Sequence, residues 1–393
     1  MPRLLLILAL AAGVVVAGTG CESDPAGPPL GASADVPAAV SWNEALLEIV
    51  AAHPWTPPHA ARAYAYLGVA QHEALLELAQ GPGASSRVAA RAAVATASAA
   101  MLRELYPAEE ARIARADRAL RPRAGAFPAR AQIDLGEAAG ARAASRLIER
   151  ARADGSDFAW DGVLPDGEGF WFGSSGEPPV APLAGRMLPW SMASVEAFDP
   201  GPPPAFGSPA FLEDLSQVRA FSDQRTAEMT SIARFYEYGP GTPSPAGQYV
   251  DLAGELILRH GLDELAAART YALLGMAMAD AGIACWHAKY EYMVMRPSQV
   301  DPEITLVVAL PNFPAYPSGH SSFSGAAEVV LGVLFPSEGP MIRAFAEENG
   351  LSRVYGGVHF EFDNQAGLEL GRRIGPLVLS ADGRPAPAAP AAR

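Results

Sequence analysis

The sequence predicts an all-α protein made of helical bundles, two of them packed together and each of the four-helix type. Three observations predict this class. From Ser41 onward, apolar residues recur at spacings of three and four, as at Trp42, Ala45 and Ile49, which is the period of an amphipathic helix. The alternation of apolar and polar residues that marks strands is scarce. Half of the 393 residues are hydrophobic and 18% are charged, which is enough apolar material for a large core.

The first residues predict an export signal. Arg3 is followed by an apolar run over residues 4–16, the pattern of a secretory signal peptide spanning residues 1–20. Small residues then lead into Cys21, an arrangement that resembles the lipobox of bacterial lipoproteins, although Gly18 stands where a leucine-like residue is usual. The resemblance implies an exported protein, lipid-anchored at the cell envelope through an acylated Cys21. An ordinary cleaved signal with an incidental cysteine is the alternative.

The rest of the chain divides by composition. Residues 21–40 are rich in Pro, Gly, Ala and Ser, which predicts a flexible tether. Residues 41–154 predict an N-terminal helical bundle, and residues 210–380 predict a C-terminal bundle that holds the candidate site. Between them, residues 155–209 lack periodicity and are rich in proline, glycine and aromatic residues. This loop is expected to form a lid or entrance wall, or else a surface decoration packed by its own aromatic side chains. Residues 381–393 predict a disordered tail.

Apolar periodicity places the individual helices. In the first bundle they are expected at 60–80, 86–106, 108–121 and 131–153. In the second bundle they are expected at 211–237, 247–260, 262–295, 320–334, 338–349 and 364–380. Arg269 and Asp280 interrupt the most apolar of these segments, which therefore predicts a buried core helix rather than a membrane span.

Charge and cysteine content exclude several functions. The net charge of −14 argues against nucleic acid as a partner, because a phosphate backbone requires a basic footprint. Two cysteines cannot form a disulfide framework, and their spacing with histidine matches no zinc ribbon or finger. The 29 basic residues comprise 28 arginines and one lysine, Lys289. A lysine kept against this bias indicates a place where a compact ammonium is needed and a planar guanidinium does not fit.

Three polar clusters in the last third of the chain point to an anion site. The first is Lys289 with Arg296, followed by Pro297. If residues up to Met295 are helical, the two cations are seven residues apart on one face and can share an anion. The second is Pro317-Ser318-Gly319-His320 at the start of a helix, where a hydroxyl, a glycine N–H and a helix N-terminus together receive an anion.

The third cluster adds another cation and a second histidine. Ser352-Arg353 is followed by His359, with Asp363 four residues further on. His359 supplies a nucleophilic or ligating nitrogen. Asp363 is expected to orient that imidazole and to cap the next helix.

In this order, the three clusters resemble the signature of vanadium-dependent haloperoxidases and type 2 phosphatidic acid phosphatases, with no substitution in the residues that define it. The likeness is closer to the chloroperoxidase-like bacterial branch. Trp286 and Phe313 are similar to the aromatic pair on the halide side of that branch's pocket. The segment from Arg225 to Glu228 resembles the helix that supplies an acidic partner to the cage arginines, a role that falls to Glu228.

The resemblance implies a vanadate cofactor and a function for each residue. Arg296, Arg353 and Lys289 would neutralise the oxyanion, and the Ser318 hydroxyl and Gly319 N–H would donate hydrogen bonds to it. His359 would bond to vanadium, and His320 would act as the acid–base residue. The reaction would oxidise a halide, or a small organic substrate, with hydrogen peroxide to hypohalous acid or its equivalent, with Lys289 polarising the peroxide.

Two other functions fit the same clusters. An exported acid phosphatase would use His359 as nucleophile, forming a phosphohistidine, and His320 to protonate the leaving alcohol. The apolar pair Trp286 and Phe313 favours a halide over a phosphoester. A lipoprotein that binds an oxyanion without chemistry is the remaining alternative, and the intact pair of histidines weighs against it.

Overall fold

The computed structural model describes residues 36–81, 86–123, 129–173 and 177–382. The predicted signal peptide, Cys21 and most of the predicted tether and tail lie outside these residues. All of these described residues belong to one compact unit. Its elements are helices, and the β pairing among the described residues is one isolated bridge between Phe170 and Val294. The predicted all-α class is therefore confirmed.

The first group of helices packs through alanine and glycine. It comprises α2 (Ala38–Ala52), α3 (Pro57–Ala79), α4 (Arg87–Leu105), α5 (Glu110–Leu120) and α6 (Ala129–Arg152). A Cβ added at Gly136 of α6 would lie 2.1 Å from the Ala89 carbonyl oxygen of α4, and one at Gly140 would lie 2.3 Å from that of Ala93. Only glycine permits this approach of the two backbones.

Helix α2 begins at Ala38, so the predicted tether, residues 21–40, extends three residues too far.

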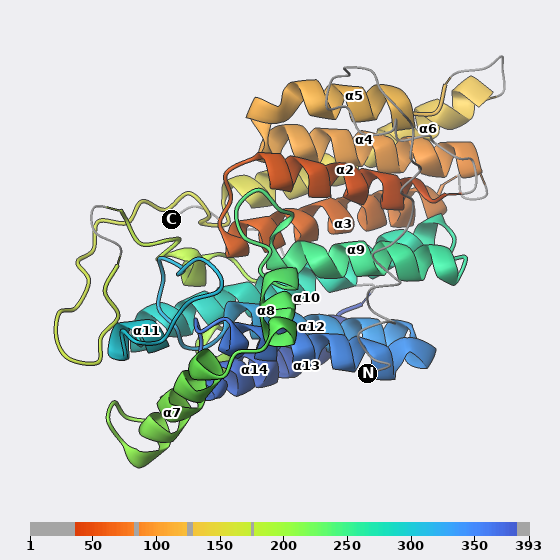
Figure 1. Ribbon diagram of the computed structural model, residues 1–393. Coiled ribbons are helices and arrows are strands. Elements are labelled where there is room, and N and C mark those ends of the chain that lie inside the picture. The colour runs from red at the N-terminus through yellow and green to blue at the C-terminus, as the bar shows by residue number, and fades with distance from the viewer. Residues whose placement is uncertain (1–35, 82–85, 124–128, 174–176, 383–393) are drawn as a thin grey trace, which may run out of the picture. The chain divides into compact units, whose positions relative to one another are not determined.

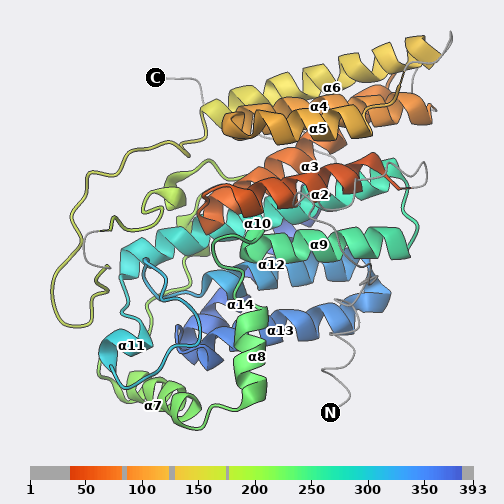
Figure 2. The same cartoon turned by 45° about the horizontal axis from the view of Figure 1, so that its top comes forward.

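The second group surrounds one long helix, α10 (Glu264–Tyr292). Its other long members are α9 (Ser244–Arg259), α12 (Gly319–Leu334), α13 (Gly339–Tyr355) and α14 (Glu361–Ser380). Helix α10 packs against α3 on one side and against α12 and α14 on the other, so it joins the two groups (Figures 1 and 2). Gly275 of α10 rests on the backbone of Ala65 in α3. None of the described helices is both long enough and apolar enough to span a bilayer.

Three helix boundaries differ from the sequence prediction. The single helix expected at 211–237 is two helices, α7 (Pro209–Asp223) and α8 (Ala227–Phe235), because the Thr226 hydroxyl caps a new helix by accepting the Met229 N–H. Helix α10 stops at Tyr292, since Met293 adopts a left-handed conformation with φ of 50°. Helix α13 continues six residues beyond the predicted end and thereby includes Arg353.

The segment between α6 and α7 is held to the helices at defined points. It contains two short turns, η2 (Ala184–Arg186) and η3 (Glu196–Phe198). The buried carboxylate of Asp280 on α10 accepts the N–H groups of Trp190 and Ser191 at 2.7 and 2.8 Å. The Trp190 ring packs under the Arg150 guanidinium of α6, at 3.9 Å from the ring centroid. This loop is therefore fixed against α10 beside the candidate site.

Candidate active site

The three sequence clusters meet where the ends of α10, α12, α13 and α14 come together. Arg296 Nη1 lies 2.9 Å from His359 Nε2. The Ser318 N–H donates to the Asp363 carbonyl at 2.9 Å, which joins the start of α12 to the start of α14. Lys289 Nζ bonds the carbonyl of Pro317, the first residue of the second cluster, at 2.6 Å. The structure thus brings together residues that are up to 74 positions apart (363 − 289).

The route by which Lys289 and Arg296 meet differs from the prediction. They were expected two turns apart on one helix, but α10 ends between them and Arg296 immediately precedes the short helix α11 (Pro297–Val300). The left-handed turn at Met293 redirects the chain. Both cations instead reach the Pro314 carbonyl, Lys289 Nζ at 2.8 Å and Arg296 Nη2 at 3.2 Å. Their convergence therefore depends on tertiary contacts rather than on helical spacing.

Lys289 is completely buried, and its ammonium group is matched by three backbone carbonyls. Nζ donates to Pro314 and Ala315 at 2.8 Å each and to Pro317 at 2.6 Å. Three acceptors around one nitrogen suit a rotatable ammonium and not a planar guanidinium. Burial lowers the pKa of Lys289 to about 7. These bonds hold Lys289 behind the aromatic rings of Trp286 and Phe313, at 5.7 and 5.1 Å from their centroids.

Arg296 is also buried and links the carbonyl segment to His359. Its Nε and Nη2 donate to the Phe313 carbonyl at 3.1 and 2.8 Å, and Nη1 donates to the Val358 carbonyl at 2.8 Å. Burial lowers the pKa of Arg296 to about 10. A guanidinium fixed by carbonyls on two sides is a preorganised positive group beside the imidazole of His359.

His359 is held as a neutral imidazole with its Nε2 lone pair facing the cations. Nδ1 donates to Asp363 Oδ2 at 2.8 Å, and Nε2 accepts from Arg296. Burial first, and Arg296 second, hold the pKa of His359 well below its usual range. The same Asp363 oxygen accepts the Phe360 N–H at 3.0 Å and so caps α14. This tautomer is the one that a metal ligand or a nucleophile requires.

Arg353 and His320 form the other side of the site. Arg353 donates from Nε to the Ser352 hydroxyl at 2.9 Å and from Nη2 to the Ala233 carbonyl, and burial lowers its pKa to about 10. His320 lies in the first turn of α12, where Nε2 donates to the Glu237 carbonyl at 3.1 Å. Burial, followed by the charge of Arg353, lowers the pKa of His320 well below its usual range. His320 is therefore neutral and its Nδ1 is free of a proton.

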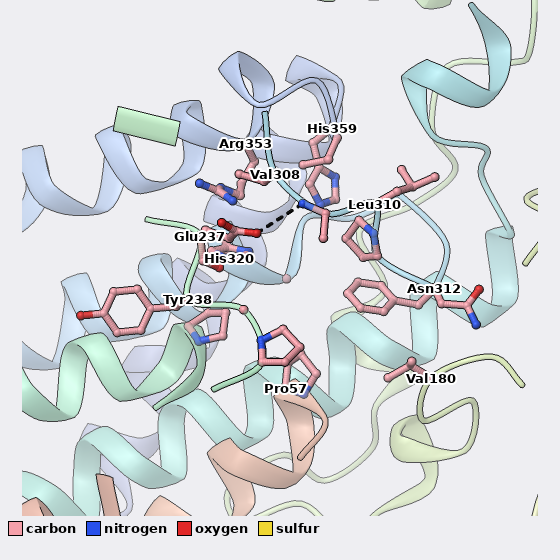
Figure 3. A pocket seen from close by; sticks show the side chains of 18 of the residues that line it. Pro57, Val180, Glu237, Tyr238, Val308, Leu310, Asn312, His320, Arg353 and His359 are labelled. Carbon is pink, nitrogen blue, oxygen red and sulfur yellow. Dashed lines mark hydrogen bonds between the residues drawn. The ribbon is translucent and has the colours of Figure 1, made fainter. Parts of the chain in front are cut away.

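Glu228 does not take the place expected of it, so that prediction is wrong. It is exposed in the first turn of α8. The acidic side chain near Arg353 is Glu237, which lines the same cavity and partly offsets the depressed pKa of that arginine. Glu237 Oε1 accepts the Ala309 N–H at 3.3 Å, and Figure 3 shows its carboxylate beside Arg353 and His320. The end of α8 at Phe235 brings Glu237 inward, and the sequence held no signal for this turn.

Ser318 and Gly319 form the helix N-terminus at the site. Ser318 is buried, and its hydroxyl accepts the Ser321 N–H at 3.3 Å as the cap of α12. Gly319 is the first residue of α12 and lines the cavity. A Cβ added there would lie 3.2 Å from the Trp286 ring. The N-terminus of α12 therefore presents backbone N–H groups and a positive dipole end to the site, as an anion requires.

A cavity of about 260 Å³ opens beside these groups. Figure 3 shows His320, His359 and Arg353 at one end of it. Trp286 and Phe313 line it as well, with their ring centroids 5.1 Å apart. One wall of the site is thus cationic and the adjoining wall is aromatic.

The donor set fits an oxyanion. Lys289, Arg296 and Arg353 are buried cations, and burial depresses the pKa of each, which shows that their charge lacks full compensation. An anion placed among them would supply that compensation. Among the described residues, no group of three or more His, Cys, Asp or Glu side chains is arranged to hold a metal ion. A metal that arrives as an oxyanion needs only one such ligand, and His359 offers it.

Comparisons with known proteins identify one family model and several solved structures that resemble this chain. Residues 270–384 match the model of the PAP2 superfamily, and this range contains all three clusters. The crystal structure of a bacterial vanadium-dependent iodoperoxidase superposes with a TM-score of 0.75 at 23% identity, covering 87% of this chain and 95% of that chain. The apo form of a bacterial vanadium-dependent chloroperoxidase gives 0.69 at 15% identity, covering 84% and 95%. The holo-type structure of a bacterial vanadium-dependent chloroperoxidase gives a TM-score of 0.68 at 16% identity, covering 86% of this chain and 94% of that chain.

These likenesses establish that the chain has the fold of vanadium haloperoxidases and of the PAP2 superfamily, and they confirm the resemblance seen in the three clusters. A search of curated proteins finds no match to the sequence.

Proposed function

We propose that the protein is a vanadium-dependent haloperoxidase that uses hydrogen peroxide to oxidise a halide to hypohalous acid. This proposal rests on one observation: a cationic wall and an aromatic wall adjoin in the same cavity. His359 Nε2 faces the buried cations Arg296 and Arg353, and the adjoining wall consists of the apolar rings of Trp286 and Phe313. The cationic wall suits vanadate, and the apolar wall suits a poorly hydrated halide better than a phosphoester.

The residues that would hold vanadate are those of the cage. His359 Nε2 would be its protein ligand, because Asp363 fixes the proton on Nδ1. Arg296 and Arg353 would offset the charge of its oxygens, and the N-terminus of α12 would add backbone N–H donors. When bound, vanadate supplies a Lewis-acidic centre that activates hydrogen peroxide toward halide.

The other residues of the site move protons and shape the electric field. His320 is neutral near pH 7, so it can accept a proton from hydrogen peroxide and later return it to the departing oxygen as water. A bound oxyanion would favour the protonated amine of Lys289, which would then add a positive charge behind the aromatic wall, with its orientation set by three carbonyls. Trp286 and Phe313 exclude water from the place where the halide approaches.

The comparisons indicate which halides should be assayed as substrates. The fold is shared with an iodoperoxidase and with a chloroperoxidase, at identities of 23% and 15%. Iodide, bromide and chloride should therefore be assayed side by side, with iodide first because it is the easiest of the three to oxidise.

An acid phosphatase is the second candidate, because the same neutral His359 can act as a nucleophile toward phosphorus. One experiment separates the two. The purified protein is reconstituted with orthovanadate and assayed for bromination of a phenolic dye with peroxide. Without vanadate, it is assayed for hydrolysis of nitrophenyl phosphate. We expect the first activity and not the second.

His359→Ala removes the proposed vanadium ligand. His260→Ala is the matched control, because it removes an imidazole at the protein surface that pairs with Glu338 at 3.2 Å. Bromination should be lost in the first variant and kept in the second. Nitrophenyl phosphate hydrolysis that depends on His359, without halide oxidation, would establish the phosphatase instead. If the protein shows neither activity but still binds vanadate, the result would support the oxyanion-binding lipoprotein.

We further propose that the protein is exported and anchored by a lipid on Cys21. The proposal rests on the apolar run after Arg3 and on the small residues before Cys21. Metabolic labelling with a radioactive fatty acid should label the wild type and not a Cys21→Ala variant. Equal labelling of both, or of neither, would contradict the anchor.

A further inference from the structure

The cavity is larger than peroxide and halide chemistry requires. Its volume is about 260 Å³. A buried apolar cavity of about 150 Å³ is enough to bind benzene. A cavity of this volume therefore has room for a substituted aromatic ring beside a reacting halide.

Apolar side chains that line this cavity come from both groups of helices. Trp55 and Pro57 lie at the start of α3, whereas Leu310 and Pro311 lie in the segment before Phe313. Trp55 is fixed by its Nε1, which donates to the Thr242 carbonyl at 3.0 Å. Rigid apolar and aromatic walls around a few polar groups are the features of a preformed site for a small organic molecule.

Glu237 defines the polarity of this site. Among the described residues that line the cavity it is the only carboxylate, and its Oε1 already accepts one N–H, from Ala309. A carboxylate with remaining lone pairs can accept a hydrogen bond from a phenolic hydroxyl. With an oxyanion held by the cations, Glu237 would repel an organic anion. The cavity therefore favours a neutral aromatic ring that carries a hydrogen-bond donor.

We propose that this cavity binds a neutral phenol, which is halogenated there and not by hypohalous acid released to solvent. The proposal rests on the haloperoxidase function proposed above. With bromide, hydrogen peroxide and one proton give hypobromous acid and water. The phenol ring then forms a C–Br bond as the Br–O bond breaks, and the ring proton joins the released hydroxide as a second water. Peroxide is reduced, and the ring carbon is oxidised.

Direct binding tests the site without turnover. The probe is 3-methylphenol, titrated by calorimetry into the vanadate-loaded protein in the absence of peroxide and halide. We expect saturable binding to one site. The anion 3-hydroxybenzoate, which has a carboxylate in place of the methyl group, should bind at least tenfold more weakly, and Glu237→Gln should narrow that difference in affinity. Equal binding of the two ligands to the wild type, or no saturable binding of 3-methylphenol, would overturn the proposal.

Filling the cavity provides the matched comparison. Leu310 lines the cavity (Figure 3), so Leu310→Trp places a large ring in it, whereas Leu212→Trp makes the same change at an exposed position of α7. Binding of 3-methylphenol should weaken at least tenfold in the first variant and stay within twofold in the second. Leu310→Phe is the smaller replacement if the tryptophan variant does not fold. Unchanged affinity in a folded Leu310 variant would contradict the proposal.

The products give an independent readout. Bromination in the cavity should yield a ratio of 3-methylphenol isomers that differs from the ratio given by reagent hypobromous acid, and Leu212→Trp should keep the enzyme's ratio. Halide oxidation with the reagent's ratio would overturn the inference and leave the proposed function intact. Absence of halide oxidation would overturn the proposed function, whereas the calorimetric titration would still show whether the cavity binds 3-methylphenol.

Discussion

Arg296 Nη1 donates a hydrogen bond of 2.9 Å to Nε2 of His359, the atom that would ligate vanadium. In the anion-free protein the guanidinium therefore occupies the lone pair of the ligand nitrogen. An incoming oxyanion offers this N–H a charged oxygen in place of the imidazole nitrogen, and such charge-assisted bonds are stronger than neutral ones. Anion binding and release of the ligand nitrogen are thus the same exchange, and both depend on the tautomer that Asp363 fixes.

Asp363→Asn should weaken vanadate binding about 10–100-fold, the range typical for loss of a residue that orients a metal-bound histidine. The amide can donate to Nδ1 and so stabilise the wrong tautomer, with the proton on Nε2. Vanadate affinity is measured by equilibrium dialysis.

Asp214→Asn is the matched control, because Asp214 Oδ2 accepts the Phe362 N–H at 2.7 Å in the same first turn of α14. It changes the charge at that helix end without touching His359. Vanadate binding that falls equally in both variants would show that helix capping, not histidine orientation, is what matters.

Lys289→Arg should lose at least about 99% of the haloperoxidase activity although the charge is retained. Three carbonyls surround a single nitrogen at 2.6 to 2.8 Å, and a planar guanidinium cannot direct three N–H groups from one atom to them. kcat/KM for bromide is the measurement, and Arg118→Lys on the exposed side of α5 is the reciprocal control. Wild-type turnover in Lys289→Arg would refute the geometric argument.

The sequence predicted the helices and the convergence of the clusters better than the contacts that make them converge. Apolar periodicity identifies a helix such as α10 because its buried faces repeat. Its end at Tyr292 depends on one left-handed residue, Met293, which no periodic pattern marks. The prediction that Lys289 and Arg296 share one face of a single helix was therefore wrong, although the two side chains do meet at one carbonyl.

The partners of the site residues were also hidden from the sequence. The acceptors for Lys289 are backbone carbonyls of residues 314, 315 and 317, and every residue has a carbonyl. The wrong prediction of Glu228 as the acidic partner has a similar cause. The place of Glu237 depends on where α8 ends and the chain turns inward. Side-chain chemistry can be read along a chain, whereas backbone groups acquire their roles only through the fold.

The stability of the anion-free protein should rise with pH between about 7.5 and 8.5. Burial lowers the pKa of Lys289 from 10.5 in a model peptide to about 7. In that interval the unfolded chain binds a proton that the folded protein has released, so the free energy of unfolding increases by up to about 1.4 kcal/mol per pH unit.

Denaturant titrations at several pH values measure this slope. Lys289→Met should flatten it, and saturating phosphate should also reduce it, because an anion favours the protonated amine. A slope that is the same in wild type and Lys289→Met would assign the pH dependence to other groups.

Two glycines of α12 should respond in opposite directions to the same substitution. A Cβ at Gly325 would lie 2.2 Å from the Leu368 carbonyl oxygen of α14, whereas a Cβ at Gly332 meets nothing within 4 Å. Gly325→Ala should lower the free energy of unfolding by at least about 1–3 kcal/mol, because the two backbones must separate. Gly332→Ala should raise it by about 0.5–1 kcal/mol, because alanine is the better helix former.

The same pair tests whether the packing of α12 on α14 positions the site. His320 lies on α12, and Asp363 begins α14, so separating these helices should also weaken vanadate binding in Gly325→Ala. Gly332→Ala should bind vanadate as the wild type does. If Gly325→Ala loses stability but keeps full affinity, the contacts at the helix starts, such as the Ser318 N–H to Asp363 carbonyl bond, are sufficient to hold the site by themselves.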